Sequence, residues 1–390
     1  MYIKRDFEPL FADILRSRKV LVVYGSRQTG KTTLIEELLK SEDIQANGVV
    51  LLNGDVKADR DLLAYENMTV EKARAIIGNA RMLFVDEAQK ILDIGLTLKI
   101  IHDNLKDVHI VATGSSSFEL SEEVGEPLTG RMASFVLSPL SFRELSGAST
   151  NAVELSRLES RLRLGCYPDV VTASKESEAI ENLGQLCEAY LFKDVLKWRN
   201  LRHSEMLNKL LKALALQLGN EVSYNELGNL IGMDNETVGE YIERLEKSFV
   251  VFRLPAFSRN LRNELKKSRK VYFSDTGIRN AVIGNYLPLD CREDVGHLFE
   301  NYLIAERGKS NAFRRVNVQR YFWRLTTPAD GEIDYIEESP DIGLRAYEFK
   351  FSPKQAKKAK CPVKFMRAYP EAVWTVISRD NYVGFVNGEL

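Results

Sequence analysis

Several features that would mark a membrane, secreted or zinc-binding protein are missing from this 390-residue sequence. No run of 18 apolar residues is present, and the opening MYIKRDFEPL has no apolar signal core. The only cysteines, Cys166, Cys187, Cys291 and Cys361, lie far apart without a C-x-x-C pair, and histidine occurs only four times. These absences exclude a disulfide framework and a readable zinc site. We expect a soluble, cytoplasmic protein with no membrane partner.

An excess of charge of either sign is also missing. Lysine and arginine total 54 against 55 aspartates and glutamates, so the formal net charge is −1. The protein therefore has no overall attraction to nucleic acid, and any such binding must come from local patches. The composition, 44% apolar and 28% charged, is ordinary for a globular protein, and the length predicts two to four domains.

The most informative segment is a phosphate-binding loop. The apolar run VLVVY (20–24) predicts a buried strand, GSRQTGKT (25–32) matches G-x-x-x-x-G-K-[ST], and an apolar-periodic helix follows. In such a loop the backbone N–H groups cradle a polyphosphate, the lysine reaches the β- and γ-phosphates, and the hydroxyl holds Mg²⁺. The predicted nucleotide contacts are Gly25, Ser26, Arg27, Gln28, Thr29, Gly30, Lys31, Thr32 and Thr33. The chain is predicted to bind a nucleoside triphosphate with Mg²⁺.

A second motif predicts hydrolysis of that nucleotide. MLFVDEA (82–88) reads as a buried strand that ends in two acids, and ligands bind at the carboxyl ends of strands in open α/β sheets. We expect Asp86 to hold Mg²⁺ through its water shell and Glu87 to polarise the attacking water. A further strand, HIVATG (109–114), runs into a serine cluster that begins at Ser115. Ser115 is predicted to contact the γ-phosphate or the water, and a serine-rich turn capping a helix is the alternative.

Five short apolar runs, mostly separated by helical patterns, predict an α/β fold with a parallel sheet covered by helices on both faces. They are residues 20–24, 49–53, 82–86, 109–113 and 134–138. We expect four domains along the chain. These are an ATPase core at 1–145, a helical lid at 146–204, a winged helix at 205–284 and an α/β domain at 285–390.

The predicted winged helix contains the clearest local excess of positive charge. Two short helices around Gly-Met-Asp, followed by the strands VVFRLPAF and KVYFSD, have the order of a winged helix. The second helix is acidic, which disfavours contact with phosphates, whereas the hairpin at 253–270 is basic. Its cations are Arg253, Arg259, Arg262, Lys266, Lys267, Arg269 and Lys270. DNA binding through this wing and a role in protein packing or oligomer docking both stay open.

The last hundred residues contain a second group of charged residues. A helix with Glu300, a strand with Asp334, a strand with Glu348 and Lys350, and a further helix follow one another. Asp334, Glu348 and Lys350 match the D…[DE]-x-K pattern of restriction-endonuclease-like nucleases. Two carboxylates and a main-chain carbonyl would bind Mg²⁺ or Mn²⁺, with Glu300 as a further ligand and Lys350 orienting the water. The alternative is a buried Lys–Glu ion pair in a domain that only binds, so nuclease activity is left open.

On these motifs the chain resembles a large family of prokaryotic AAA-type ATPases with a restriction-endonuclease-like C-terminal core. The matching stretches span residues 20–351 in the expected order: GSRQTGKTTLIEELL, MLFVDEAQKI, ATGSSSFEL, LTGRMASFVLSPLSFREL, GCYPDVV, YLFKDVL, KVYFSDTGIRN, GHLFENYLIAE, GEIDYIEE and EFKFS. The resemblance implies ATP as the nucleotide, a homo-oligomer, and Arg131 as an arginine finger acting across a subunit boundary. A structural ion pair is the alternative for Arg131. Many AAA-type ATPases place asparagine at the first sensor, where this chain offers Thr113 and Ser115.

Two functions are consistent with the sequence. The first is an ATP-binding and ATP-hydrolysing, DNA-associated switch or motor that is coupled to a metal-dependent, nuclease-like domain. The second is a regulatory ATPase whose C-terminal domain is a catalytically silent interaction module. The two hypotheses differ in whether Glu300, Asp334, Glu348 and Lys350 converge on one cleft open to solvent.

Overall fold

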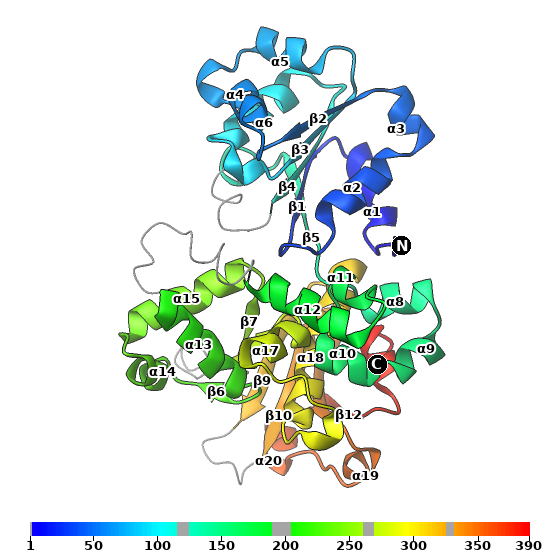
Figure 1. Ribbon diagram of the computed structural model, residues 1–390. Coiled ribbons are helices and arrows are strands. Elements are labelled where there is room, and N and C mark those ends of the chain that lie inside the picture. The colour runs from blue at the N-terminus through cyan, green and yellow to red at the C-terminus, as the bar shows by residue number, and fades with distance from the viewer. Residues whose placement is uncertain (1, 115–124, 189–203, 260–268, 325–330) are drawn as a thin grey trace. The chain divides into compact units, whose positions relative to one another are not determined.

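A computed structural model describes residues 2–114, 125–188, 204–259, 269–324 and 331–390 (Figure 1). The chain divides into two compact units. The nucleotide unit comprises residues 2–139 with 247–249, and the C-terminal unit comprises residues 140–246 and 250–390. Across the described ranges, no helix combines the length and the apolar character needed to cross a bilayer.

The nucleotide unit is built on a five-stranded parallel sheet with the strand order β2-β3-β4-β1-β5. Its strands are β1 (Val20–Tyr24), β2 (Val49–Asn53), β3 (Met82–Asp86), β4 (His109–Gly114) and β5 (Met132–Val136). The predicted parallel sheet is confirmed, because each apolar run forms one of these strands. Side chains on β1, β3 and β4 are buried on both faces, which explains why those runs are continuously apolar rather than alternating.

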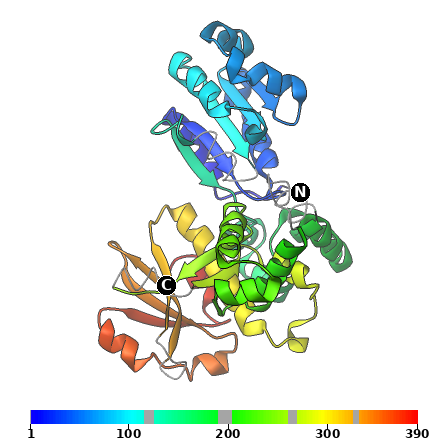
Figure 2. The ribbon, with the colours of Figure 1, turned by 90° about the vertical axis from the view of Figure 1, so that its left-hand side faces the viewer.

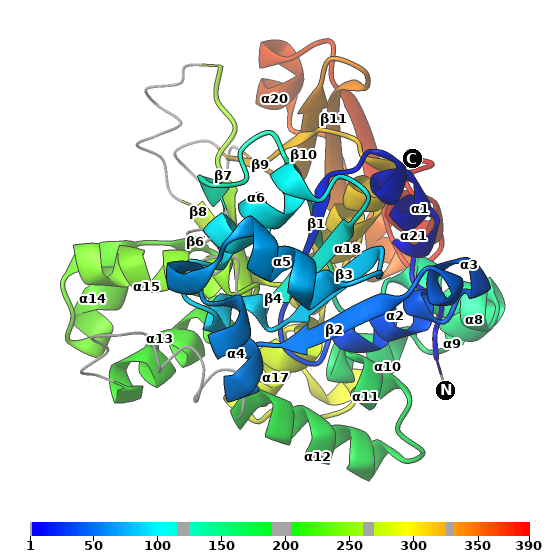
Figure 3. The same ribbon diagram turned by 90° about the horizontal axis from the view of Figure 1, so that it is seen from above.

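Helices cover both faces of this sheet (Figures 1 and 3). On one face, α5 (Val70–Ile77) and α6 (Ile94–Asn104) pack against Val20 and Val22 of β1. On the other face, α1 (Glu8–Arg16) and α2 (Lys31–Leu39) pack against Leu21 and Val23, the alternate residues of the same strand. The remaining helices of the unit are α3 (Glu42–Ala46) and α4 (Lys57–Leu63), with short 3₁₀ turns at Tyr65–Asn67 and Ala88–Lys90.

The strand order determines where the candidate site lies. Strands β3, β4 and β1 are neighbours and run in the same direction, so their carboxyl ends meet at one edge of the sheet. The loop after β1, the acids at the end of β3 and the polar end of β4 therefore come together although they are far apart in the sequence.

The C-terminal unit opens with helices. They are α8 (Phe142–Ala148), α9 (Asn151–Ser156), α10 (Leu158–Leu164), α11 (Pro168–Val171) and α12 (Glu176–Cys187). A buried carboxylate joins this group to α17 (Thr276–Ile283), because Asp275 caps α17 through Gly277 N at 2.9 Å and also accepts from Cys166 N at 2.7 Å. These helices are therefore packed together with the segment that follows the basic hairpin.

The middle of this unit has the order helix, strand, helix, helix, strand, strand. Its elements are α13 (Ser204–Leu216), β6 (Glu221–Val222), α14 (Tyr224–Ile231), α15 (Asn235–Lys247), β7 (Val251–Pro255) and β8 (Arg269–Phe273). The three strands form an antiparallel sheet with the order β6-β8-β7, so β8 is its central strand. Ser223 caps α14 by accepting from Glu226 N.

A four-stranded sheet with the order β12-β11-β10-β9 completes the unit; Figure 2 shows its strands in orange and red. The strands are β9 (Gln319–Arg324), β10 (Glu332–Ser339), β11 (Gly343–Phe349) and β12 (Val373–Ile377). Only the β11–β12 pairing is parallel. The helices are α18 (Val295–Arg314), α19 (Pro353–Ala356), α20 (Val363–Ala368) and α21 (Tyr382–Val386), with a 3₁₀ turn at Leu289–Cys291. The two sheets are linked where Phe257 N donates to Phe322 O at 2.6 Å.

Candidate functional site

The phosphate loop connects β1 to α2 through two glycines that no other residue could replace without strain. Gly25 has φ +153°, and a Cβ there would lie 2.3 Å from the carbonyl oxygen of Leu137. Gly30, at the N-cap of α2, is left-handed with φ +87°. The loop therefore turns tightly and directs the N-terminus of α2 toward the carboxyl edge of the sheet.

Lys31 is buried and is held by its own loop. Its Nζ donates to the carbonyl oxygens of Gly25 at 2.8 Å and Ser26 at 2.9 Å. Burial lowers the pKa of Lys31 to about 8, although the charges of Glu87 and Asp86 oppose that shift. The lysine is therefore ready to exchange two neutral carbonyl partners for phosphate oxygens, which form stronger, charge-assisted bonds.

Asp86 is the centre of a hydrogen-bonded group that joins three elements. Thr32 on α2 donates to its Oδ2 at 2.9 Å, and Thr113 on β4 donates to its Oδ1. The Thr32 hydroxyl and the Asp86 carboxylate are adjacent hard oxygens, the donor type that Mg²⁺ takes beside phosphate. These residues therefore fit the predicted metal.

Glu87 follows in a left-handed backbone conformation, with φ +48°. Its N–H donates to Asp86 Oδ1 at 3.1 Å and to Thr113 Oγ1 at 3.3 Å, while its carboxylate accepts from Gln89 Nε2 at 2.7 Å. A non-glycine residue in this region costs on the order of 1–3 kcal/mol and is found preferentially at functional sites. The hydrogen bonds of its neighbours hold Glu87 at the end of β3, where the sequence predicts the water-polarising residue.

Thr113 is the described one of the two residues that the sequence offers for the first sensor. Its side chain is fully buried and bridges Asp86 and Glu87, so it connects the predicted metal ligand to the predicted base. Ser115 and the serines after it lie outside the described residues, so their predicted contact stays a prediction.

The other predicted loop residues differ in exposure. Ser26 and Thr29 are buried, with Thr29 Oγ1 donating to Ser26 O at 2.9 Å, whereas Gln28 and Thr33 are exposed and Arg27 is intermediate. The sequence interpretation missed Arg5, which is buried and donates to Thr29 O at 2.7 Å and Ser138 O at 2.6 Å. Arg5 therefore holds the back of the phosphate loop, although no motif in MYIKRDF signals this role.

Comparison with known families agrees with this geometry. Residues 17–146 match the model of a family described as an AAA domain. The chain carries an AAA-type ATPase domain. Residues 155–287, beyond the AAA domain, match the model of a domain of unknown function, DUF8612. This second match leaves the predicted winged helix and nuclease-like domain as predictions.

Relatives that are somewhat longer than this chain occur in distant organisms. An uncharacterized protein of Mycobacterium tuberculosis is 25% identical over 340 residues, which are 86% of this chain and 71% of that protein. An uncharacterized protein of Methanocaldococcus jannaschii, MJ1637, is 25% identical over 391 residues, covering 87% of this chain and 77% of the relative. The similarity therefore extends well beyond the AAA domain.

Solved structures resemble the chain weakly. AMPPCP-bound DnaA from Aquifex aeolicus is 14% identical with a TM-score of 0.30, covering 63% of this chain and 89% of that one. Pif1 helicase from Candida albicans is 17% identical with a TM-score of 0.28, covering 47% and 48%. Scores this low carry no information about the activity of this protein.

Arg131 of the AAA domain lies at the opposite edge of the sheet from Lys31. It immediately precedes β5, and its carbonyl accepts from Val20 N at 2.9 Å, where β1 begins. Its Nε donates to Asp103 Oδ1 at 2.9 Å, and the bonds from Arg131 and His102 lower the pKa of Asp103 to about 2. Five strand residues, roughly 16 Å, separate this edge from the phosphate loop, so Arg131 does not contact the nucleotide site of its own chain.

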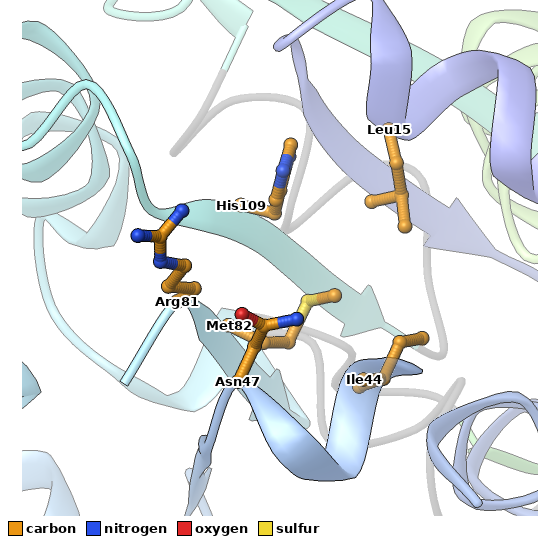
Figure 4. A pocket seen from close by; sticks show the side chains of 6 residues that line it. All are labelled: Leu15, Ile44, Asn47, Arg81, Met82 and His109. Atoms are coloured by element: carbon orange, nitrogen blue, oxygen red, sulfur yellow. The ribbon is translucent and has the colours of Figure 1, made fainter. Parts of the chain in front are cut away.

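A pocket of about 230 Å³ also lies at the amino ends of β3 and β4 (Figure 4). It is lined by Leu15, Ile44, Asn47, Arg81, Met82 and His109. Since the phosphate loop is at the carboxyl edge of the same sheet, this pocket is separate from the nucleotide site.

The C-terminal unit brings together all four residues of the second predicted group. Lys350 Nζ lies 2.5 Å from Glu348 Oε1, and Asp334 Oδ2 accepts from Phe349 N at 2.7 Å. Burial raises the pKa of Asp334 well above its usual range, and the charges of Glu300 and Glu348 raise it further. These four side chains therefore lie near one another, with Glu300 buried and the other three intermediate in exposure, and their role stays a prediction.

Three further residues belong to this C-terminal cluster and were missed in the sequence. Lys270 on β8 is only 2% exposed; its Nζ lies 3.3 Å from Glu300 Oε1 and pairs with Glu332. Tyr272, two residues along the same strand, donates its hydroxyl to Glu300. Lys270 lies on the predicted basic hairpin, but its ammonium is buried and paired with acids rather than available to a partner. The alternation of Lys270 and Tyr272 on one face of the strand is the signal that could have revealed it.

The geometry of this cluster does not fit a divalent metal. Among the residues that the structure describes, no group of three or more His, Cys, Asp or Glu side chains is arranged to hold one. Each carboxylate already has a protein donor: Glu300 and Glu332 have Lys270, Glu348 has Lys350, and Asp334 has a backbone N–H. The predicted Mg²⁺ or Mn²⁺ site at Asp334, Glu348 and Glu300 is thus not supported.

Acids also neutralise other cations of the predicted wing. Arg253 is 2.5 Å from Glu246, and Arg259 lies 3.1 Å from Glu338 and 2.8 Å from Glu371. Arg269 Nη1 donates to the hydroxyl of Tyr224 at 3.4 Å. The remaining cations, Arg262, Lys266 and Lys267, lie outside the described residues, so DNA binding by the wing stays a prediction.

Proposed function

We propose that this protein is an ATP-driven regulatory switch in which the AAA domain hydrolyses ATP and the C-terminal unit acts as a non-catalytic interaction module. The observation that carries the first part is the contact of Thr32, Asp86 and Thr113. It joins the phosphate loop, the acidic strand and the sensor strand at one edge of the sheet. A change in the bound phosphates at this point would be transmitted to three elements.

In this proposal Lys31 releases the carbonyls of Gly25 and Ser26 and binds the β- and γ-phosphates. Mg²⁺, held by the Thr32 hydroxyl and through water by Asp86, would neutralise charge on the phosphate oxygens. In this proposal the backbone N–H groups of residues 25–32 surround the phosphates. Gly25 and Gly30 provide the tight turn that this arrangement requires.

Glu87 would accept a proton from the attacking water. Its carboxylate is now bonded to Gln89 and lies 3.7 Å from Lys90, so it must exchange the Gln89 bond for the water. Thr113 would keep the base in place by accepting from Glu87 N. In this proposal Glu87 is the base, Lys31 is the phosphate-binding cation, and Thr32 with Asp86 is the donor set for the metal.

Arg131 is proposed to complete the site of a neighbouring copy. Its position at the amino edge of the sheet supports this role, because it is far from its own phosphate loop and one-third exposed. A homo-oligomer is therefore part of the proposal, and the bond to Asp103 would have to be exchanged when copies assemble.

We propose that the C-terminal unit contains a winged helix and a restriction-endonuclease-like domain, on the basis of the order of its helices and strands. Residues 205–284 have the succession of helices and strands of a winged helix, and residues 285–390 have a restriction-endonuclease-like order, with helix α18 before a mixed sheet. The pairing of the acids with Lys270 and Lys350 supports the silent-module alternative over metal-dependent cleavage.

Two measurements test this function. Wild-type protein should hydrolyse ATP with Mg²⁺, whereas Glu87→Gln should bind ATP and turn it over at least about a hundredfold more slowly, the scale of lost general-base help. Lys40→Ala, a change at an exposed lysine of the same chain segment, is the control and should retain full turnover. Equal rates for wild type and Glu87→Gln would contradict the assignment of the base.

The second measurement concerns the C-terminal unit. Plasmid DNA should stay intact with Mg²⁺ or Mn²⁺, with and without ATP. Nicking by the wild type that disappears in Asp334→Ala would contradict the silent-module assignment and favour a live nuclease.

A further inference from the structure

The C-terminal cluster gathers residues from four elements around one ammonium group. Lys270 comes from β8 of the hairpin, Glu300 from α18, and Glu332 with Asp334 from β10. Glu348, at the end of β11, carries its own cation, Lys350. Lys270 is therefore the one member that joins the three-stranded sheet to the helix and the sheet of the nuclease-like part.

The burial of Lys270 shows how strongly this arrangement depends on its partners. Its side chain is 2% exposed, and its Nζ lies over the ring of Phe322, 5.3 Å from the ring centroid. Leaving a buried charge without its partner is strongly destabilising, by several kcal/mol. Lys270 and Glu300 are both buried and therefore depend on each other, whereas Glu332 reaches Lys270 from a position that is one-third exposed.

A divalent cation would need the same carboxylates. Hard cations such as Mg²⁺ and Mn²⁺ require several oxygens that converge without a competing charge. Here the Glu300 oxygen that would face a metal already accepts from Lys270 and Tyr272. A metal ion beside the ammonium would meet like-charge repulsion at a few ångströms in a poorly solvated place.

We infer that Lys270 stands in the place of the metal: its ammonium supplies the positive charge of the C-terminal cluster, closes the cluster to divalent cations and fastens β8 to α18 and β10. Removing that ammonium should leave Glu300 and Glu332, the two carboxylates that share it, free to bind a divalent cation. This inference concerns the C-terminal unit alone and does not depend on ATP hydrolysis.

Lys350 provides a matched control within the same cluster. Its side chain is 35% exposed and bonded to a single carboxylate, so its loss leaves Glu348 accessible to water. Lys350→Met removes the same charge from the same neighbourhood but leaves Lys270 between Glu300 and Glu332. Only Lys270→Met should therefore open the cluster.

The experiment measures binding of Mn²⁺ to the full-length, nucleotide-free protein by electron paramagnetic resonance. Wild type, Lys270→Met and Lys350→Met are each compared with the same protein carrying Glu332→Gln, so that ions at other sites cancel. We expect Lys270→Met to gain one equivalent of Mn²⁺ with a Kd of about 1 mM or tighter, the range of simple oxygen sites. This binding should disappear with Glu332→Gln, while wild type and Lys350→Met should show no difference between backgrounds.

Thermal unfolding gives a second measurement, which is informative even when Lys270→Met is much less stable than wild type. Lys270→Met should melt at a lower temperature than wild type and regain part of the loss with Mn²⁺, because an ion that binds only the folded state stabilises it. Mn²⁺ should leave the melting of wild type and Lys350→Met unchanged.

Three results would overturn the inference. They are Glu332-dependent Mn²⁺ binding by the wild type, a folded Lys270→Met that gains no such binding, and a Lys270→Met that stays unfolded with Mn²⁺. Turnover of ATP, measured on the same samples, reports separately on the proposed function.

Discussion

The Thr113 hydroxyl at the end of β4 donates to the Asp86 carboxylate at the end of β3, and the same hydroxyl accepts from Glu87 N. One side chain thus connects the predicted metal ligand with the predicted base. Its burial makes the contact costly to lose, because a buried polar atom without a partner destabilises the fold by about 1–3 kcal/mol.

Thr113→Val, which keeps the shape and removes the hydroxyl, is therefore expected to destabilise the AAA domain by that amount. It should also slow single-turnover hydrolysis at least about tenfold while ATP still binds, since Glu87 loses its support. Thr113→Ser retains the hydroxyl and should stay close to wild type. Wild-type hydrolysis by the valine variant would show that Thr113 has no part in sensing.

A pH dependence of nucleotide binding follows from Lys31. Burial lowers the pKa of the empty site to about 8, so the lysine loses its proton above that pH, whereas phosphates bind its charged form. Affinity for ATP should be constant near neutral pH and fall above about pH 8, with a limiting slope of about tenfold per pH unit. Fluorescence titrations with an ATP analogue would measure this.

Two variants test whether Lys31 is the group that causes this pH dependence. Lys31→Ala should abolish tight binding at every pH, because it removes the charge-assisted contact. Lys31→Arg keeps its charge throughout and should give a flat profile, whatever its absolute affinity. A sloping profile in Lys31→Arg would assign the titration to another group.

The bond between Arg131 and Asp103 allows the two roles of the arginine to be separated. If Arg131 serves a neighbouring site, Arg131→Ala should lose turnover while binding ATP, and Asp103→Ala should retain turnover. If the pair is only structural, both variants should change stability by about 0–1 kcal/mol, as exposed ion pairs do, and neither should change turnover selectively.

Concentration provides an independent check on the same residue. A site completed by a neighbour requires the ATPase rate to rise more steeply than linearly with protein concentration. A linear rate over a hundredfold dilution, with a monomeric mass in solution, would leave Arg131 as a structural ion pair.

Gly165 should be intolerant of substitution. It has φ +78°, and a Cβ there would lie 1.9 Å from the Asp275 oxygen that caps α17. Gly165→Ala is expected to destabilise the C-terminal unit by about 3 kcal/mol or more, through strain and a displaced buried carboxylate.

Gly184→Ala is the control for that prediction. Gly184 lies in α12 with no atom within 4 Å of an added Cβ, so alanine should be neutral or stabilise by up to about 1 kcal/mol. Thermal unfolding compares the two. Equal melting of Gly165→Ala and wild type would contradict the assigned role of the glycine.

The sequence predicts the nucleotide unit well, because its signals are local. A strand buried on both faces is a continuous apolar run, and the phosphate loop is a contiguous motif between a strand and a helix. The predicted sheet, the loop, Asp86 and Glu87 could therefore be placed from short segments. The strands with Asp334 and Glu348 were found for the same reason.

Partners that are distant in the sequence could not be predicted in this way. Lys270 lies beside other basic residues in KKSRKVYF, and only the folded chain shows that Glu300, 30 residues later, neutralises it. Arg5 is similar, since its acceptors are carbonyls at Thr29 and Ser138 and a carbonyl leaves no trace in composition. Such contacts are set by tertiary packing, which periodicity and motif spacing do not contain.

The parallel direction of the five strands has a consequence for symmetry. The phosphate loop lies at the carboxyl edge of the sheet and Arg131 at the amino edge. Each copy therefore presents a nucleotide site at one edge and the arginine at the opposite edge. If the arginine serves the next copy, the interface is head-to-tail, pairing two different surfaces. Repeating such an interface generates a closed ring or an open filament, and a dimer built from one such contact keeps one incomplete site.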